Sequence, residues 1–106
     1  MDRKKQKRLE AAGWKVGSPA EFLELAPEEE QLVEIHLSLS MKLRELRQRR
    51  RWTQTVLAKR LGSSQSRVAK MEAGDPSVSL DLLVRGLLAT GASPRDIGRV
   101  LLSIAA

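Results

Sequence analysis

Two short helical patterns meet at a sharp break in the stretch TQTVLAKRLGSSQSRVAKMEAG. Before the break, Leu57 and Leu61 lie four residues apart and therefore on one face of a helix. After it, Val68 and Met71 lie three residues apart and share a face in the same way. Gly62 lies at the break, and glycine readily adopts the positive φ angle of a tight turn. The stretch predicts two short helices whose apolar contacts fix their crossing angle.

A longer helical pattern precedes this stretch. Pro27 suits the first position of a helix, and the glutamates at positions 28–30 lie in the first turn, where the helix dipole favours negative charge. No strong helix breaker follows until about Arg50. The apolar positions recur every three or four residues and are Leu32, Ile35, Leu39, Leu43 and Leu46. We expect one continuous helix with these leucines and the isoleucine on its buried face.

Helical patterns also occupy most of the remaining chain. One helix is expected between Ser79 and Gly91, and another after Ser93, where Asp96 completes a capping box. The apolar stripe of this last helix, which faces either the core or a dimer interface, contains Ile97, Val100, Leu101 and Ile104. Near the start, SPAEFLEL predicts a short helix after a loosely ordered arm at residues 1–17. The sequence contains no convincing β-hairpin pattern, so the expected fold class is all-α.

Charge is unevenly distributed along the 106 residues, a length that suits one domain, or one domain with an arm. The net charge of +6 favours anionic partners, of which nucleic acid is the commonest. Residues 18–36 contain six glutamates and no lysine or arginine, whereas the segments on both sides are basic. This order indicates segments that face different surroundings, although complementation of the helix dipole explains part of it.

Several classes of protein are disfavoured by composition. The chain has no cysteine and one histidine, His36, so neither a disulfide framework nor a zinc cluster is expected, and we expect no cofactor. No nucleophile–base pair or phosphate-binding loop is evident, so we expect no enzymatic activity. There is no apolar run of membrane-spanning length, and a cytoplasmic protein with no membrane partner is the default expectation.

The run LRELRQRRRWTQTVLAKRLGSSQSRVAKMEAG resembles the helix-turn-helix of the Cro/phage-repressor, or Xre, family. The matching elements are L-R-x-x-R before the motif, T-Q at its start, L-A, L-G at the turn, S-Q-S, and the closing E-x-G. This resemblance implies a five-helix lambda-repressor-like domain with an N-terminal helical extension. We expect residues 1–36 to form the arm and acidic extension, and residues 37–106 to form the DNA-binding domain with its C-terminal helices.

In this family the second motif helix lies in the major groove of double-stranded DNA with its N-terminal residues toward the base edges. Gln65 is suited to adenine and Arg67 to guanine, while Ser66 can bond a base or a phosphate. Lys70 is expected at a phosphate or an outer base, and the family's glutamine, here Gln54, at a phosphate. The expected DNA-binding residues are Gln54, Ser64, Gln65, Ser66, Arg67 and Lys70. The alternative interpretation of the second helix is an ordinary solvated face.

Other positions have expected structural or accessory roles. Arg47 and Glu72 resemble a family pair that forms a buried salt bridge, Ala58 permits close helix approach, and Gly62 makes the turn. Arg49, Arg50 and Arg51 either reach DNA phosphates or only complement the dipole at the end of their helix. Arg51 also occupies a turn position where glycine is common in the family.

A narrower resemblance links LEAAGWKVGSPAEFLEL and MEAGDPSVSLDLLVRGLLATGAS to antitoxins of the HigB–HigA type. It implies a homodimeric repressor of a palindromic operator that also neutralises a small, basic, RelE-like ribonuclease toxin. The acidic segment is then either a docking surface for the toxin or an ordinary exposed face. Two alternatives remain: a free-standing Xre-type regulator without a toxin, and, from a different class, a protein-binding adaptor built on the same fold.

Overall fold

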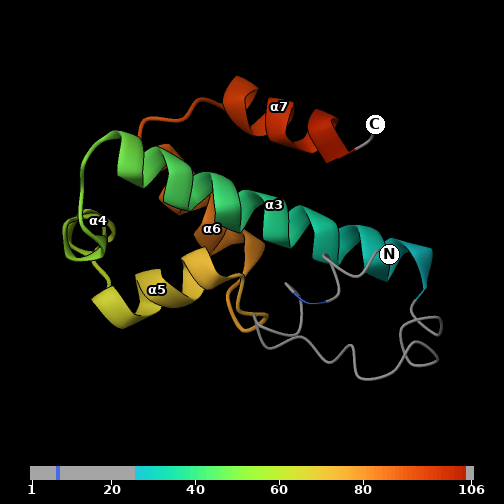
Figure 1. Ribbon diagram of the computed structural model, residues 1–106, viewed down its shortest axis with the longest axis horizontal. Coiled ribbons are helices and arrows are strands. Elements are labelled where there is room, and N and C mark those ends of the chain that lie inside the picture. Colours follow the sequence, from blue (N-terminus) through green and yellow to red (C-terminus); the bar gives the residue numbers. More distant parts are fainter. Residues whose placement is uncertain (1–6, 8–25, 105–106) are drawn as a thin grey trace.

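The computed structural model describes Lys7 and residues 26–104, and the chain within residues 26–104 is built from helices (Figure 1). The bounds are Pro27–Arg49 for α3, Gln54–Leu61 for α4, Gln65–Ala73 for α5, Leu80–Ala89 for α6 and Pro94–Ile104 for α7. The all-α prediction is therefore confirmed. The arm expected at residues 1–17 and the short helix expected from Ser18 to Leu25 fall outside this part, apart from Lys7.

Helix α3 is the longest element and spans 23 residues, or about 35 Å at 1.5 Å per residue. It begins at Pro27 and has three glutamates in its first turn. It then continues without interruption through positions 36 and 37, where the N-terminal extension was expected to meet the DNA-binding domain. Leu39 and Leu43 are buried as expected, but the side chain of Leu32 is 49% exposed. The expectation of a buried Leu32 was wrong, because in the N-terminal part of α3 the side chains turned toward the core belong to Val33 and His36.

Hydroxyl side chains cap four of the helices. The Oγ1 atom of Thr53 accepts a hydrogen bond from the N–H of Val56 at 3.2 Å, and Ser64 and Ser79 cap α5 and α6 in the same way. At α7, Ser93 and Asp96 form the complete predicted capping box, in which each side chain accepts from the other residue's backbone N–H. These caps satisfy backbone donors that the first turn of a helix leaves without a partner inside the helix.

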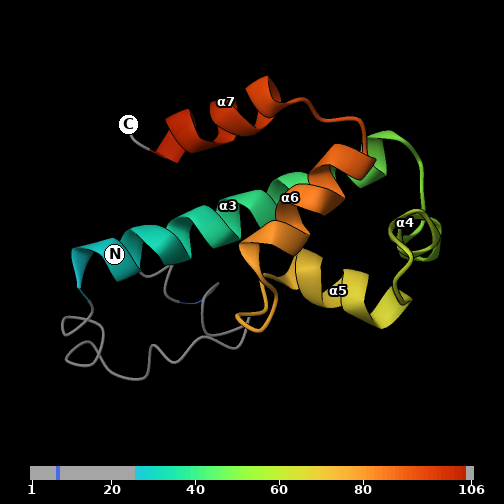
Figure 2. The same ribbon diagram turned by 180° about the vertical axis from the view of Figure 1, so that it is seen from behind.

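Helices α4 and α5 pack against each other, and behind them α3 and α6 complete the core (Figures 1 and 2). The turn between α4 and α5 contains Gly62 in the left-handed region, with φ of 64°. Ala58, Leu57, Val68 and Met71 are all nearly inaccessible to solvent. Burying a large apolar side chain contributes on the order of 1.5–3 kcal/mol, so these contacts set how α5 is presented.

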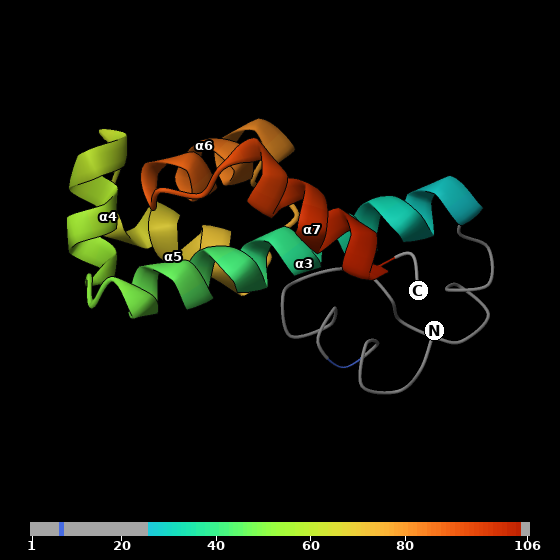
Figure 3. The ribbon, with the colours of Figure 1, turned by 90° about the horizontal axis from the view of Figure 1, so that it is seen from above.

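The remaining helices close the core from the other side. Gly86 of α6 lies so near its neighbours that a Cβ atom there would be 2.8 Å from the Met71 Cε atom, so glycine permits the close approach. Helix α7 crosses over α3 (Figure 3), and its Ile97 and Val100 pack against the core. Leu101 of the same predicted stripe is instead 41% exposed, and Leu102 beside it is 73% exposed. Across the described helices, none combines the length and apolar character needed to cross a membrane.

Candidate nucleic-acid interface

Helix α5 has one face in the core and one face in solvent. Val68 and Met71 have no accessible surface, because they pack between α5 and the rest of the fold. The side chains on the opposite face at and after the N-terminus of α5 are exposed, and they are Ser64, Gln65, Ser66, Arg67 and Lys70. The structure thus exposes together Ser64, which caps α5, and the four α5 residues that the sequence assigns to DNA contact.

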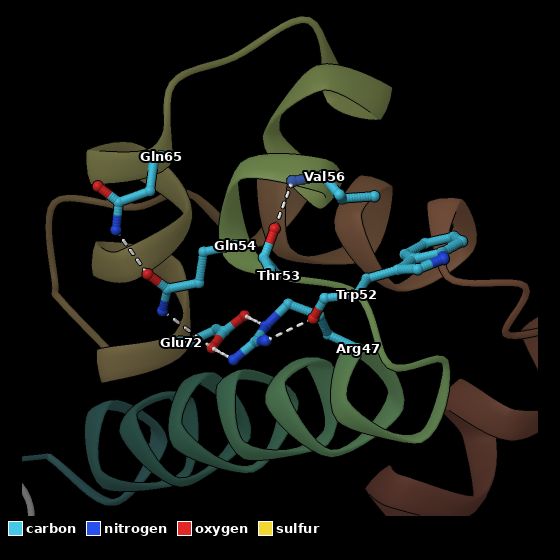
Figure 4. Close-up of polar contacts among 7 residues, drawn as sticks. All are labelled: Arg47, Trp52, Thr53, Gln54, Val56, Gln65 and Glu72. Carbon is cyan, nitrogen blue, oxygen red and sulfur yellow. Dashed lines mark hydrogen bonds and ion pairs between the residues drawn. The ribbon is translucent and has the colours of Figure 1, made fainter.

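A chain of hydrogen bonds connects the first residue of α5 to the interior (Figure 4). The Nε2 atom of Gln65 donates to the Oε1 atom of Gln54 at 2.7 Å. Gln54 in turn donates from its own Nε2 atom to Glu72 at 3.2 Å. The three side chains come from the start of α5, the start of α4 and the end of α5, so the two motif helices are bonded at the surface as well as in the core.

Glu72 is held by Arg47 of α3. The Arg47 Nε atom lies 2.5 Å from one carboxylate oxygen and its Nη2 atom 2.9 Å from the other, which is a bidentate arrangement. Arg47 also donates to the backbone carbonyl of Trp52 at 2.8 Å. Only 12% of the Arg47 side chain and 4% of the Glu72 side chain are exposed. The hydrogen bond to Glu72 raises the pKa of Arg47 above its usual value, so the cation is retained.

The Glu72 carboxylate, paired with Arg47, determines how both glutamine amides are oriented. A carboxylate only accepts hydrogen bonds, so the NH₂ group of Gln54 must face Glu72 and its carbonyl oxygen must face Gln65. Gln65 therefore turns its NH₂ group toward Gln54, and its carbonyl oxygen and second N–H remain for other partners. One oxygen and one N–H on the same amide are the pair that can bond an adenine edge.

A small hollow of about 250 Å³ lies beside the exposed face of α5. Hydroxyl groups and cations predominate in its lining, which consists of Ser64, Ser66, Arg67, Lys70, Ser77 and Val78. Ser77 comes from the loop after α5, where its N–H and Oγ–H both donate to Asp75. These hydrogen bonds hold the pKa of Asp75 below its usual value. The hollow offers donors and positive charge, which suit an anionic oxygen group such as a phosphate.

The three arginines at the end of α3 are in different surroundings. In Figure 1 this end of α3 and the N-terminus of α5 lie on opposite sides of α4. Arg49 forms an exposed ion pair with Glu45, and Arg51 adopts a left-handed backbone with φ of 58° at the turn where glycine is common in the family. The guanidinium of Arg50 donates to the carbonyl of Thr90 at 2.5 Å and lies 5.1 Å from the ring centre of Trp52. Arg50 therefore connects the ends of α3 and α6.

Two residues near the interface were not singled out as functional by the sequence. Ser77 belongs to the turn sequence Asp-Pro-Ser, and this turn signal could have placed its hydroxyl against Asp75. His36 lies at helical spacing from the buried residues Val33, Ser40 and Leu43, so it is a titratable side chain on the buried face of α3. Such a residue is normally buried with a hydrogen-bond partner.

A family model described as a helix-turn-helix domain matches residues 38–100, which contain α4 to α7 up to Val100 and the C-terminal half of α3. Neither the curated proteins nor the solved structures include a match to the chain. Among the described residues, no group of three or more histidine, aspartate or glutamate side chains is arranged to hold a metal ion.

Proposed function

The chain belongs to the helix-turn-helix domain family, of the Xre and Cro-like type, and on that premise we propose that it is a sequence-specific DNA-binding regulator. The observation that carries this proposal is the oriented amide of Gln65 at the exposed start of α5. A side chain whose hydrogen bonds are already set by Gln54 and Glu72 loses little freedom when it meets a base edge. A helix of this position and polarity enters the major groove with its first residues toward the bases.

The side chains around Gln65 have complementary roles in this proposal. Arg67 presents a guanidinium fork to guanine, and Ser66 bonds a base or a phosphate. Lys70 and the hydroxyl of Ser77 contact backbone phosphate from the rim of the hollow beside α5. Gln54 lies at the N-terminus of α4 and has a second amide hydrogen for a phosphate, as the family resemblance implies.

We also propose that the regulator is a homodimer that represses from a palindromic operator. Two copies related by a two-fold axis would place two α5 helices on successive turns of the major groove. Exposed apolar side chains on the last two helices support such an interface, since Leu102 of α7 is 73% exposed and Leu88 of α6 is 47% exposed. Of the arginines at the end of α3, Arg49 and Arg51 are the ones proposed to reach phosphate, because Arg50 bonds Thr90.

Replacing Arg67 by alanine tests the direct-readout role. We expect Arg67→Ala to weaken operator binding by about 1–3 kcal/mol and to relax the base preference at one operator position. The measurement is the affinity for the preferred duplex and for duplexes altered at single positions, at fixed salt concentration. Arg95→Ala is the matched control, because Arg95 is also an exposed helical arginine but lies on α7. An equal loss of affinity on every duplex would reject a base contact by Arg67.

A second candidate function is that of an antitoxin for a small basic toxin. It is favoured by the sequence resemblance on both sides of the motif and by the exposed surface at the start of α3, where Glu28 and Glu29 lie beside the half-exposed Leu32. The start of α3 lies at the opposite end of this helix from α4 (Figure 1). The family match does not separate antitoxins from free-standing regulators.

Copurification with the product of a neighbouring gene tests the antitoxin function. We expect a small basic protein to copurify with the full chain. It should no longer copurify with a variant that lacks residues 1–25 and has Glu28 and Glu29 replaced by glutamine. The truncation must stop before Pro27, because Val33 and His36 are part of the buried face of α3. A neighbouring product that neither binds the chain nor is toxic would favour the free-standing regulator.

A further inference from the structure

His36 is a buried polar side chain that connects two distant parts of the fold. It lies on α3, is 5% exposed, and its Nε2 atom is 2.7 Å from the carbonyl oxygen of Val78. A carbonyl oxygen only accepts hydrogen bonds, so the Nε2 atom must carry the proton. The bond joins α3 to the loop between α5 and α6, and its partners are 42 residues apart in the chain.

This loop is a compact turn that begins where α5 ends. Gly74 terminates α5 with a φ of 76°, and the N–H of Val78 returns a hydrogen bond to the carbonyl of Asp75 at 3.1 Å. The Asp75 carboxylate accepts two hydrogen bonds from Ser77, at 2.8 and 2.6 Å. The turn is therefore well ordered internally, and its position relative to α5 depends on what fastens it to the body of the protein.

Two contacts of Val78 provide that fastening. The Val78 side chain is 6% exposed and belongs to the hydrophobic core, while its carbonyl accepts the hydrogen bond from His36. An apolar contact permits sliding and rotation, whereas a hydrogen bond at 2.7 Å fixes the direction of the peptide group. This peptide group joins Val78 to Ser79, so fixing it holds the backbone of Val78, which directly follows Ser77 in the turn.

The position of this loop affects the exposed surface beside α5. Ser77 and Val78 line the same hollow as the α5 side chains of Arg67 and Lys70. We propose that His36 is a positioning residue for DNA binding, which fixes the loop after α5 so that Ser77 keeps its place with Lys70 in the lining of the hollow. This inference rests on the proposed function, because it assigns His36 a role in the same DNA-facing surface without any contact to DNA.

Two substitutions separate the hydrogen bond from simple filling of space. His36→Leu keeps an apolar side chain of similar size and removes the donor, whereas His36→Gln places an amide N–H near the position of the Nε2 atom. The probe is a duplex that the native chain selects from a random-sequence library, with a shuffled duplex of the same composition for comparison. Affinities are measured at a temperature at which circular dichroism shows each variant to be fully folded.

We expect His36→Leu to weaken binding of the selected duplex about tenfold, the effect of losing roughly one hydrogen bond, and His36→Gln to stay within about twofold of the native chain. Native affinity in His36→Leu would overturn the proposal. So would equal losses in both variants, because the donor would then be irrelevant.

A measurement on the native chain covers the case in which His36→Leu does not fold. The ¹⁵N spectrum of the imidazole should show the proton on Nε2 both without and with the selected duplex, and this proton should exchange slowly with solvent, because His36 is buried and the bond to Val78 holds the proton. A proton on Nδ1 alone, or rapid exchange of the Nε2 proton, would contradict a loop fixed by His36. If the native chain binds no duplex, the proposed function fails, and this spectrum still decides whether His36 fixes the loop.

Discussion

Arg47→Met is expected to lower the free energy of unfolding by about 3–5 kcal/mol, because it leaves a buried carboxylate without its cation. Only 4% of the Glu72 side chain is exposed, so water cannot replace the two hydrogen bonds that Arg47 donates. Urea unfolding followed by circular dichroism measures the change. The variant should also bind DNA more weakly, because Glu72 no longer orients Gln54 and, through it, Gln65.

Two comparisons isolate the effect of burial. Arg49→Met removes an ion pair of the same chemical type, but 66% of the Arg49 side chain and 44% of the Glu45 side chain are exposed, so its expected effect is within about 1 kcal/mol. Combining Arg47→Met with Glu72→Leu removes both charges and should recover a large part of the stability but not the DNA affinity. Equal losses in Arg47→Met and Arg49→Met would show that the buried pair has no special role.

Leu57→Ala is expected to lower the free energy of unfolding by about 2–5 kcal/mol. Leu57 has no accessible surface and belongs to the core cluster where α4 meets α5, so the substitution leaves a cavity in the contact that sets their crossing angle. Chemical denaturation gives the change in stability. The fraction of chain able to bind DNA should fall in parallel as temperature approaches the lowered midpoint.

The neighbouring position provides the control. Val56→Ala removes apolar atoms from the same helix, but Val56 is 37% exposed and the resulting space is open to water. Its effect should therefore be well below that of Leu57→Ala. A loss for Leu57→Ala no larger than that for Val56→Ala would mean that the α4–α5 contact contributes little to the fold.

The sequence predicted the helices because their ends depend on local chemistry. A serine or threonine hydroxyl reaches the N–H three residues ahead, as at Thr53 and Ser64, so the cap can be identified from a short window. Glycine at a left-handed position is also a local requirement, as at Gly62 and Gly74. The family resemblance added the placement of Arg47 against Glu72, which the structure has as a bidentate contact.

The details that the sequence did not provide depend on packing between distant segments. Spacing alone could not decide whether Leu32 or Val33 faces inward, because that choice depends on what packs against the N-terminal half of α3. The bond from Gln65 to Gln54 connects residues 11 positions apart, and the bond from His36 to Val78 connects residues 42 positions apart. Arg50 similarly meets Thr90 only because α3 and α6 end side by side.

Binding-site selection tests most directly whether the exposed face of α5 reads base sequence. The native chain and the double variant Gln65→Ala with Arg67→Ala are each used to enrich duplexes from a random-sequence library at the same salt concentration. The proposal predicts that the native chain enriches a two-fold symmetric site, and that the double variant loses preference at specific positions of that site while still binding DNA. Enrichment of the same site by both proteins, or no enrichment by the folded native chain, would contradict it.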